Sequence, residues 1–172
     1  LAVGASPPAA LGTGGTSGPV TRGVYDLDAT QLRPLPLAAE EAEAVRTAFG
    51  TRTSQVLVKD EATEAAVKQQ PLADYRVVHL GAHGIMSTKF PPRSALVLRP
   101  SGNEDGLLQA REILNLRLNA ALVTLSAWDT STGATQGQDG VASLVRPFVA
   151  GGARAVVANL WAADDTFSAA LM

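Results

Sequence analysis

Apolar residues recur along the chain with two different periods that alternate from one end to the other. Short, near-continuous apolar runs predict strands buried on both faces, as in the interior of a parallel sheet. Apolar residues spaced three and four apart predict amphipathic helices. The predicted strands are 1–5, 55–58, 75–80, 94–98, 120–125 and 155–160. The predicted helices are 38–49, one ending near Gln70, one within 106–116 after a turn, 141–150, and one beginning at Thr166.

This alternation of strands and helices predicts an α/β fold with a mostly parallel central sheet and helices on both faces. The 172 residues suit a single domain. Residues 6–36 are rich in Gly, Pro, Ser and Thr, and we expect a flexible loop there. The helix beginning at Thr166 is cut at Met172, so we expect a domain truncated at its C-terminus. Pro147 conflicts with the helix 141–150, which should either kink there or start later.

Composition and charge narrow the function classes. Hydrophobic residues make up 46% and charged residues 17% of the chain, and the net charge of −2 leaves no basic footprint for nucleic acid. The sequence has no apolar run of about 18 residues, no cationic amphipathic stretch and no signal-peptide n-region at its start. We therefore expect a cytoplasmic protein with neither a nucleic acid nor a membrane partner. The chain has no cysteine, which removes disulfides, thiolate metal sites and thiol nucleophiles together.

Two predicted strand ends carry candidate chemistry, because sites in parallel sheets lie beyond the carboxyl ends of the strands. His83 and Gly84 follow the strand 75–80, and residues 126–130 follow the strand 120–125. His83 could act as a general base or acid, or it could be a turn histidine bonded to a loop carbonyl. His79, inside the strand, is better explained as a core histidine with a satisfied hydrogen bond. Two histidines without a cysteine make a weak metal signal, and we expect no metal or cofactor.

Other polar clusters give weaker signals. Asp129, Asp139, Asp164 and Asp165 lie in predicted loops, and for Asp139 and Asp165 helix capping is the default interpretation. The glycine-rich stretch 133–140 lacks the lysine of a P-loop, so a nucleotide site is not indicated. The sequence contains no G-x-S-x-G elbow and therefore no α/β-hydrolase nucleophile.

Several blocks resemble one known family in the same order. Residues 75–84, Tyr-Arg-Val-Val-His-Leu-Gly-Ala-His-Gly, resemble the histidine strand of CHAT domains, caspase-like domains often found behind tetratricopeptide repeats in bacterial proteins. Residues 122–130, Leu-Val-Thr-Leu-Ser-Ala-Trp-Asp-Thr, resemble the nucleophile block of that family, which normally reads Ser-Ala-Cys-x-Thr. The remaining blocks are 61–63, 94–98, 105–108 with 112–113, and 151–161 followed by Asp164 and Asp165, so that the resemblance spans about residues 37–172.

The resemblance implies a three-layer caspase-like sandwich and a cysteine endopeptidase mechanism. A thiolate at one strand end would attack a peptide carbonyl while a histidine at the neighbouring strand end handles the proton. His83 matches that histidine, Trp128 stands at the cysteine position, and the Gly84 N–H would help hold the oxyanion. The implied substrate-binding residues are Asp129, Trp161, Asp164 and Asp165. The implied partners are a peptide or protein ligand and a tetratricopeptide repeat region of the same protein.

The missing cysteine leaves three hypotheses open. In the first, the domain is catalytically inactive and serves as a peptide-binding or regulatory module. In the second, the chain is an inactivated or truncated form of an active cysteine endopeptidase with a Cys/His dyad. In the third, it is a structural α/β domain without a groove. A hydroxyl of Ser126, Thr130 or Ser131 is the remaining substitute nucleophile, and Trp128 could be natural, introduced, or the mark of a paralogue with a different task.

Overall fold

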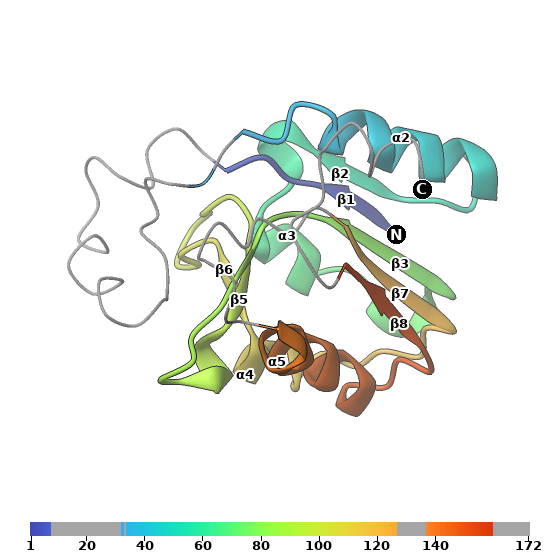
Figure 1. Ribbon diagram of the computed structural model, residues 1–172. Coiled ribbons are helices and arrows are strands. Elements are labelled where there is room, and N and C mark those ends of the chain that lie inside the picture. The colour runs from blue at the N-terminus through green and yellow to red at the C-terminus, as the bar shows by residue number, and fades with distance from the viewer. Residues whose placement is uncertain (8–31, 33, 127–136, 160–172) are drawn as a thin grey trace.

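The structure is a computed structural model, and it describes residues 1–7, 32, 34–126 and 137–159. Most of the predicted loop over 6–36 and the predicted helix from Thr166 lie outside the described residues. The described part is built around a five-stranded parallel sheet, with helices packed on it and a small antiparallel sheet beside it (Figure 1). The α/β prediction is therefore confirmed.

The large sheet has the strand order β2-β1-β3-β7-β8, and all its neighbouring pairs are parallel. Its strands are β1 (Ala2–Gly4), β2 (Val56–Val58), β3 (Val77–Gly81), β7 (Leu122–Ser126) and β8 (Val156–Ala158). The two long strands, β3 and β7, are adjacent and largely buried, which explains their near-continuous apolar sequences. Parallel neighbours need crossover connections, and helices supply several of them.

Helix α2 (Ala38–Phe49) covers one face of the sheet, with the bounds that the apolar spacing predicted. It packs against β1, β2 and β3 (Figure 1). The approach is closest at Gly4, where an added Cβ would overlap the Ala38 carbonyl oxygen and lie 2.6 Å from the Ala38 carbonyl carbon. The absence of a side chain at Gly4 therefore lets the first turn of α2 rest directly on the sheet.

The opposite face carries the main hydrophobic core. Leu80 of β3 and Leu125 of β7 pack in one cluster with Phe148 of α5, and all three are almost fully buried. The helices on this side are α3 (Glu64–Lys68), α4 (Ala110–Ile113) and α5 (Gly137–Ala150). Short 3₁₀ turns occupy Lys59–Glu61, Leu72–Asp74 and Pro91–Arg93. Thr63 caps α3, its side-chain oxygen accepting a 3.0 Å hydrogen bond from the Ala66 N–H.

Helix α5 differs from the prediction at its start. It begins at Gly137, earlier than the expected residue 141, and Pro147 lies inside it. Of the two alternatives that Pro147 left open, a kink or a later start, the later start was wrong. The helix ends as predicted at the Gly151-Gly152 pair, where Gly152 has a φ of +112° that favours glycine.

The small antiparallel sheet corrects the prediction for residues 106–116. Its order is β4-β5-β6, with β4 (Gly84–Ile85), β5 (Ala95–Val97) and β6 (Leu107–Gln109). Leu107 and Leu108 pair with Val97 and Leu96, so the expected helix is reduced to the single turn of α4. The pairing partner, β5, lies about ten residues earlier, outside the window of the local apolar spacing, which therefore could not reveal it.

Candidate functional site

His83 lies just beyond the carboxyl end of β3, beside the end of β7. The two strands are in register from Val77 opposite Leu122 to Gly81 opposite Ser126. The pairing continues one step further, because the Ala82 N–H donates a 3.2 Å hydrogen bond to the Ser126 carbonyl. His83 follows Gly81 by two residues, and the chain leaving Ser126 starts at the same edge of the sheet. The predicted juxtaposition of the two strand ends is thus present in the fold.

Backbone pairing fixes the position of His83 and orients Gly84. The His83 carbonyl accepts a 2.8 Å hydrogen bond from the Val97 N–H, and Gly84 lies opposite Leu96. Opposed residues in an antiparallel pair alternate between bonded and non-bonded positions, so this bond makes Gly84 and Leu96 the non-bonded pair. The Gly84 N–H consequently lies outside the β4–β5 ladder, as a donor to an oxyanion would require. The His83 residue itself is 1% exposed.

The other predicted site residues lie outside the described residues. These are Trp128, Asp129, Trp161, Asp164 and Asp165, together with the hydroxyls of Thr130 and Ser131. Ser126 is described: it ends β7, is 1% exposed, and its hydroxyl has no hydrogen-bond partner among the described residues.

A second histidine forms a buried polar array under α2. The Nδ1 atom of His79 lies 2.7 Å from the Thr124 Oγ1 on β7. Its Nε2 atom lies 3.2 Å from Glu41 Oε1, a contact without hydrogen-bond geometry. All three residues are at most 9% exposed. The prediction that His79 is a core histidine with a hydrogen bond is confirmed.

The partner carboxylate of His79 was missed at the sequence level. Glu41 is 1% exposed although it is a charged residue of an amphipathic helix, and it contacts His79 of the sheet. A usable signal existed, since Glu41 is three residues after Ala38 and four before Val45, which places it on the apolar side. Counting charges by helical position, rather than by residue type, would have found it.

Three carboxylates converge away from the strand ends, and the ammonium group of one lysine lies among them. One oxygen from each of Glu64, Glu104 and Glu112 lies within 4.8 Å of the others. The Lys68 ammonium contacts all three, at 2.6, 2.8 and 2.8 Å respectively. The cluster therefore joins α3, the turn before β6 and α4 as an ion-pair network, with its central cationic position filled by a side chain.

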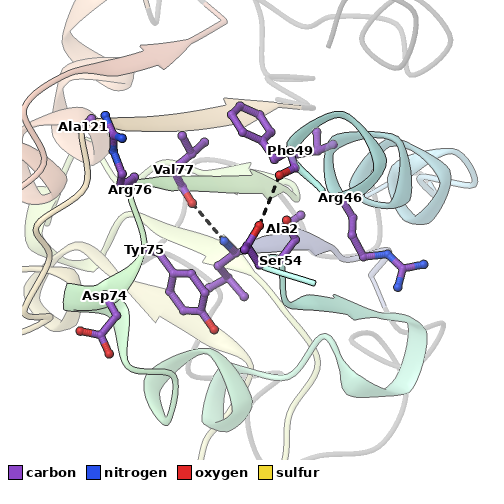
Figure 2. A pocket seen from close by; sticks show the side chains of 12 residues that line it. Ala2, Arg46, Phe49, Ser54, Asp74, Tyr75, Arg76, Val77 and Ala121 are labelled. Carbon is purple, nitrogen blue, oxygen red and sulfur yellow. Dashed lines mark hydrogen bonds between the residues drawn. The ribbon is translucent and has the colours of Figure 1, made fainter. Parts of the chain in front are cut away.

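A pocket of about 590 Å³ lies at the other end of the sheet (Figure 2). Its lining includes Leu1, Val77 and Ala121, which stand at or just before the starts of β1, β3 and β7, and Figure 2 shows Tyr75 and Phe49 bordering it. Sites in parallel sheets form beyond the carboxyl ends of the strands, where His83 lies. The pocket is thus separate from the candidate site.

Comparison with known proteins identifies the family of the chain. The CHAT domain family matches residues 3–172, nearly the whole chain. The chain belongs to the CHAT domain family. A mouse relative of this CHAT domain, tetratricopeptide repeat protein 28, is 31% identical over 166 residues. That alignment covers 74% of this chain and 6% of the mouse protein, so the chain spans a small part of its relative.

Two further findings bear on the CHAT domain. No solved structure matches the chain. Among the described residues, no helix combines the length and the apolar character needed to cross a bilayer.

Proposed function

We propose that this CHAT domain binds a peptide or protein segment at the carboxyl edge of its sheet and does not cleave it through a thiolate. The observation that carries the proposal is the combination of a retained histidine site and a complete lack of cysteine. His83 and Gly84 occupy the strand end at which the family mechanism places its histidine and oxyanion donor. A site that keeps its recognition framework and lacks its nucleophile suits binding rather than turnover.

The physical chemistry supports inactivity. Cysteine proteolysis requires a thiolate, and the residue at the nucleophile position, Trp128, offers only an indole N–H donor. Members of a catalytic pair act as a unit, so His83 without a thiol retains little of the rate acceleration. In this proposal Asp129, Trp161, Asp164 and Asp165 contact the ligand.

A panel of fluorogenic peptides tests the proposal. We expect no turnover by the chain as it stands, and no difference between it and the His83→Ala variant. We also expect peptides to bind, as measured by fluorescence anisotropy, since the binding edge does not depend on the thiol. Steady cleavage that disappears in His83→Ala would contradict the proposal.

A second candidate, an inactivated form of an active cysteine endopeptidase, is favoured by the strand register. Gly81 opposite Ser126 brings the ends of β3 and β7 together, as a Cys/His dyad would need. In this case Trp128→Cys should label with an electrophilic peptide probe and cleave a peptide. Adding His83→Ala should then reduce the rate by about 10²–10⁴-fold. A folded Trp128→Cys protein that neither labels nor cleaves would rule this candidate out.

We further propose a tetratricopeptide repeat region as a partner of the domain. The support is the name of the mouse relative, tetratricopeptide repeat protein 28. A full-length native sequence without such repeats would contradict this partner.

A further inference from the structure

A hairpin leads from the candidate site to an exposed tip. It starts where the His83 carbonyl bonds the Val97 N–H and continues through the β4–β5 pair. At its far end the Ser87 N–H donates to the Ser94 Oγ over 3.1 Å, and the Phe90 N–H donates to the Ser87 Oγ over 3.0 Å. The tip and His83 therefore belong to one continuous hydrogen-bonded unit.

Helix α5 anchors this tip. The Ser143 hydroxyl of α5 donates to the Ser94 Oγ over 3.1 Å and contacts the Met86 sulfur at 3.4 Å. Within the tip, the Arg93 N–H donates to the Phe90 carbonyl over 2.8 Å, and the prolines at 91 and 92 restrict the backbone between them. These contacts give the backbone of the tip a defined shape, which fixes where its side chains project.

Those side chains form a patch of one aromatic ring and two cations, which we name the basic-aromatic patch: Lys89, Phe90 and Arg93. The Lys89 Nζ lies 5.5 Å, and the Arg93 Cζ 5.9 Å, from the centroid of the Phe90 ring. Phe90 is 44% exposed, and both cations are exposed. Among the described residues neither cation has an ion-pair partner, although Lys and Arg form five ion pairs elsewhere in that part of the chain.

We propose that the basic-aromatic patch binds an acidic segment of the peptide ligand. The ring attracts both cations and holds them on one small surface, and a guanidinium fork beside an ammonium suits a carboxylate. The exposed edge of Phe90 gives an adjoining apolar side chain a place to pack. This inference rests on the proposed peptide-binding function and adds the chemistry of the ligand.

Peptide carboxylates fit the patch better than other anionic surfaces do. Nucleic acid binding needs many cations along a stripe, and the whole chain carries a net charge of −2. Anchoring to an anionic membrane likewise needs a larger cluster of basic residues than two. A pair of cations matches one or two carboxylates.

The distance between the patch and His83 limits the length of a ligand that could contact both. Phe90 is seven residues beyond His83, so the two are at most about 25 Å apart. An extended ligand of about seven or eight residues could therefore contact the strand end and the patch together. We place its acidic residues at one end of such a segment.

Fluorescence anisotropy with matched peptides tests this assignment on the 172-residue chain. The probes are fluorescein-labelled peptides of about twelve residues with an apolar half and a Glu-Glu pair near one end, and counterparts with Gln-Gln. We expect the Glu-Glu peptides to bind about tenfold more tightly at low salt. The Lys89→Glu/Arg93→Glu variant should lose this preference, and Phe90→Leu should weaken it.

The matched control reverses two other exposed arginines, Arg52→Glu/Arg154→Glu. These stand before β2 and β8, at the end of the sheet opposite His83, and the control should keep the preference. Equal binding of Glu-Glu and Gln-Gln peptides, or an equal loss in the control, would overturn the patch while leaving peptide binding intact. Stronger competition by single-stranded DNA or phosphatidylserine vesicles than by the acidic peptide would overturn it as well. Failure of every peptide to bind would refute the proposed function itself.

Discussion

Replacing Lys68 with methionine would remove the cation that holds three carboxylates together. Its ammonium contacts Glu64, Glu104 and Glu112 at 2.6–2.8 Å, and it links α3 to α4 and to the turn before β6. Glu64 also accepts a 2.8 Å hydrogen bond from the Gly106 N–H. Methionine preserves most of the side-chain volume, so the change isolates the charge.

The size of the expected stability loss follows from how exposed the three glutamate partners of Lys68 are. Breaking a fully buried ion pair costs about 3–5 kcal/mol, because a charge is left uncompensated. Here the side chain of Glu64 is 1% exposed, but those of Glu112 and Glu104 are 27% and 35% exposed, so water screens part of the repulsion. We expect a loss of about 2–4 kcal/mol in the free energy of unfolding at pH 7, or roughly 4–16 °C in Tm.

The pKa shifts within this cluster determine how its contribution to stability changes with pH. Partial burial opposes the charge of Lys68, but its hydrogen bonds to three carboxylates outweigh this effect and raise the pKa of Lys68. The contribution of Lys68 to stability is therefore complete below about pH 10.5, its ordinary pKa, and is lost as the pH rises through its higher pKa in the folded protein. The hydrogen bond from Lys68 lowers the pKa of Glu104. The contribution of Glu104 to stability is therefore present above about pH 4.5, its ordinary pKa, and is lost as the pH falls through its lower pKa in the folded protein. Burial raises the pKa of Glu64 even with the lysine present.

Without Lys68 the pKa values of Glu64 and Glu104 should both rise. These carboxylates would then take up protons at a higher pH than they do in the native chain, which relieves their repulsion. The stability difference between the variant and the native chain should therefore shrink on acidification.

Urea unfolding followed by circular dichroism at pH 7 and pH 5 measures this difference. Lys59→Met is the matched control, since Lys59 is exposed and has no ion pair among the described residues. A Lys68→Met loss no larger than that of the control, or one that stays constant between the two pH values, would refute the reasoning.

Two other substitutions probe the α2 face of the sheet. Gly4→Ala should lower the free energy of unfolding by about 1–3 kcal/mol, because the new methyl group overlaps the Ala38 carbonyl and displaces α2; an unchanged thermal midpoint would show that α2 does not seat on β1 as described. Thr124→Val should cost about 1–3 kcal/mol in urea unfolding, because the buried His79 Nδ1 loses its 2.7 Å partner, and Thr124→Ser should recover most of that stability. Equal losses in Val and Ser would point to packing instead of the hydroxyl.

Much of the main fold could be predicted because its signals are local. The apolar runs at β3 and β7 and the spacing within α2 follow directly from the periods of buried strands and amphipathic helices. The small sheet could not be predicted in the same way. Leu107 and Leu108 adopt a strand because β5, about ten residues earlier, supplies their hydrogen bonds.

The residues of the candidate site also divide into those that local sequence signals predict and those that depend on distant contacts. His83 and Gly84 could be found from a histidine after a buried strand, since strand ends in parallel sheets carry sites. Glu41 could not be paired with His79, because the contact bridges a helix and a strand separated by 38 residues in sequence. The basic-aromatic patch could not be predicted either, because only the fold of the tip places Lys89 and Arg93 beside the Phe90 ring.

The sequence by itself determined the strands of the large sheet and helix α2, the lack of a thiol and the residues that follow each buried strand, because these depend on residue type and on neighbours within a few positions. Only the tertiary structure decided which strands are neighbours, which carboxylates share Lys68 and which charges stand over Phe90. Those outcomes depend on contacts between segments that are distant in the chain. Burial of the apolar core brings such segments together, but the hydrophobic effect is non-directional and does not choose which of them meet. Register, close approach at Gly4 and backbone hydrogen bonding then select one arrangement among those that bury the same residues.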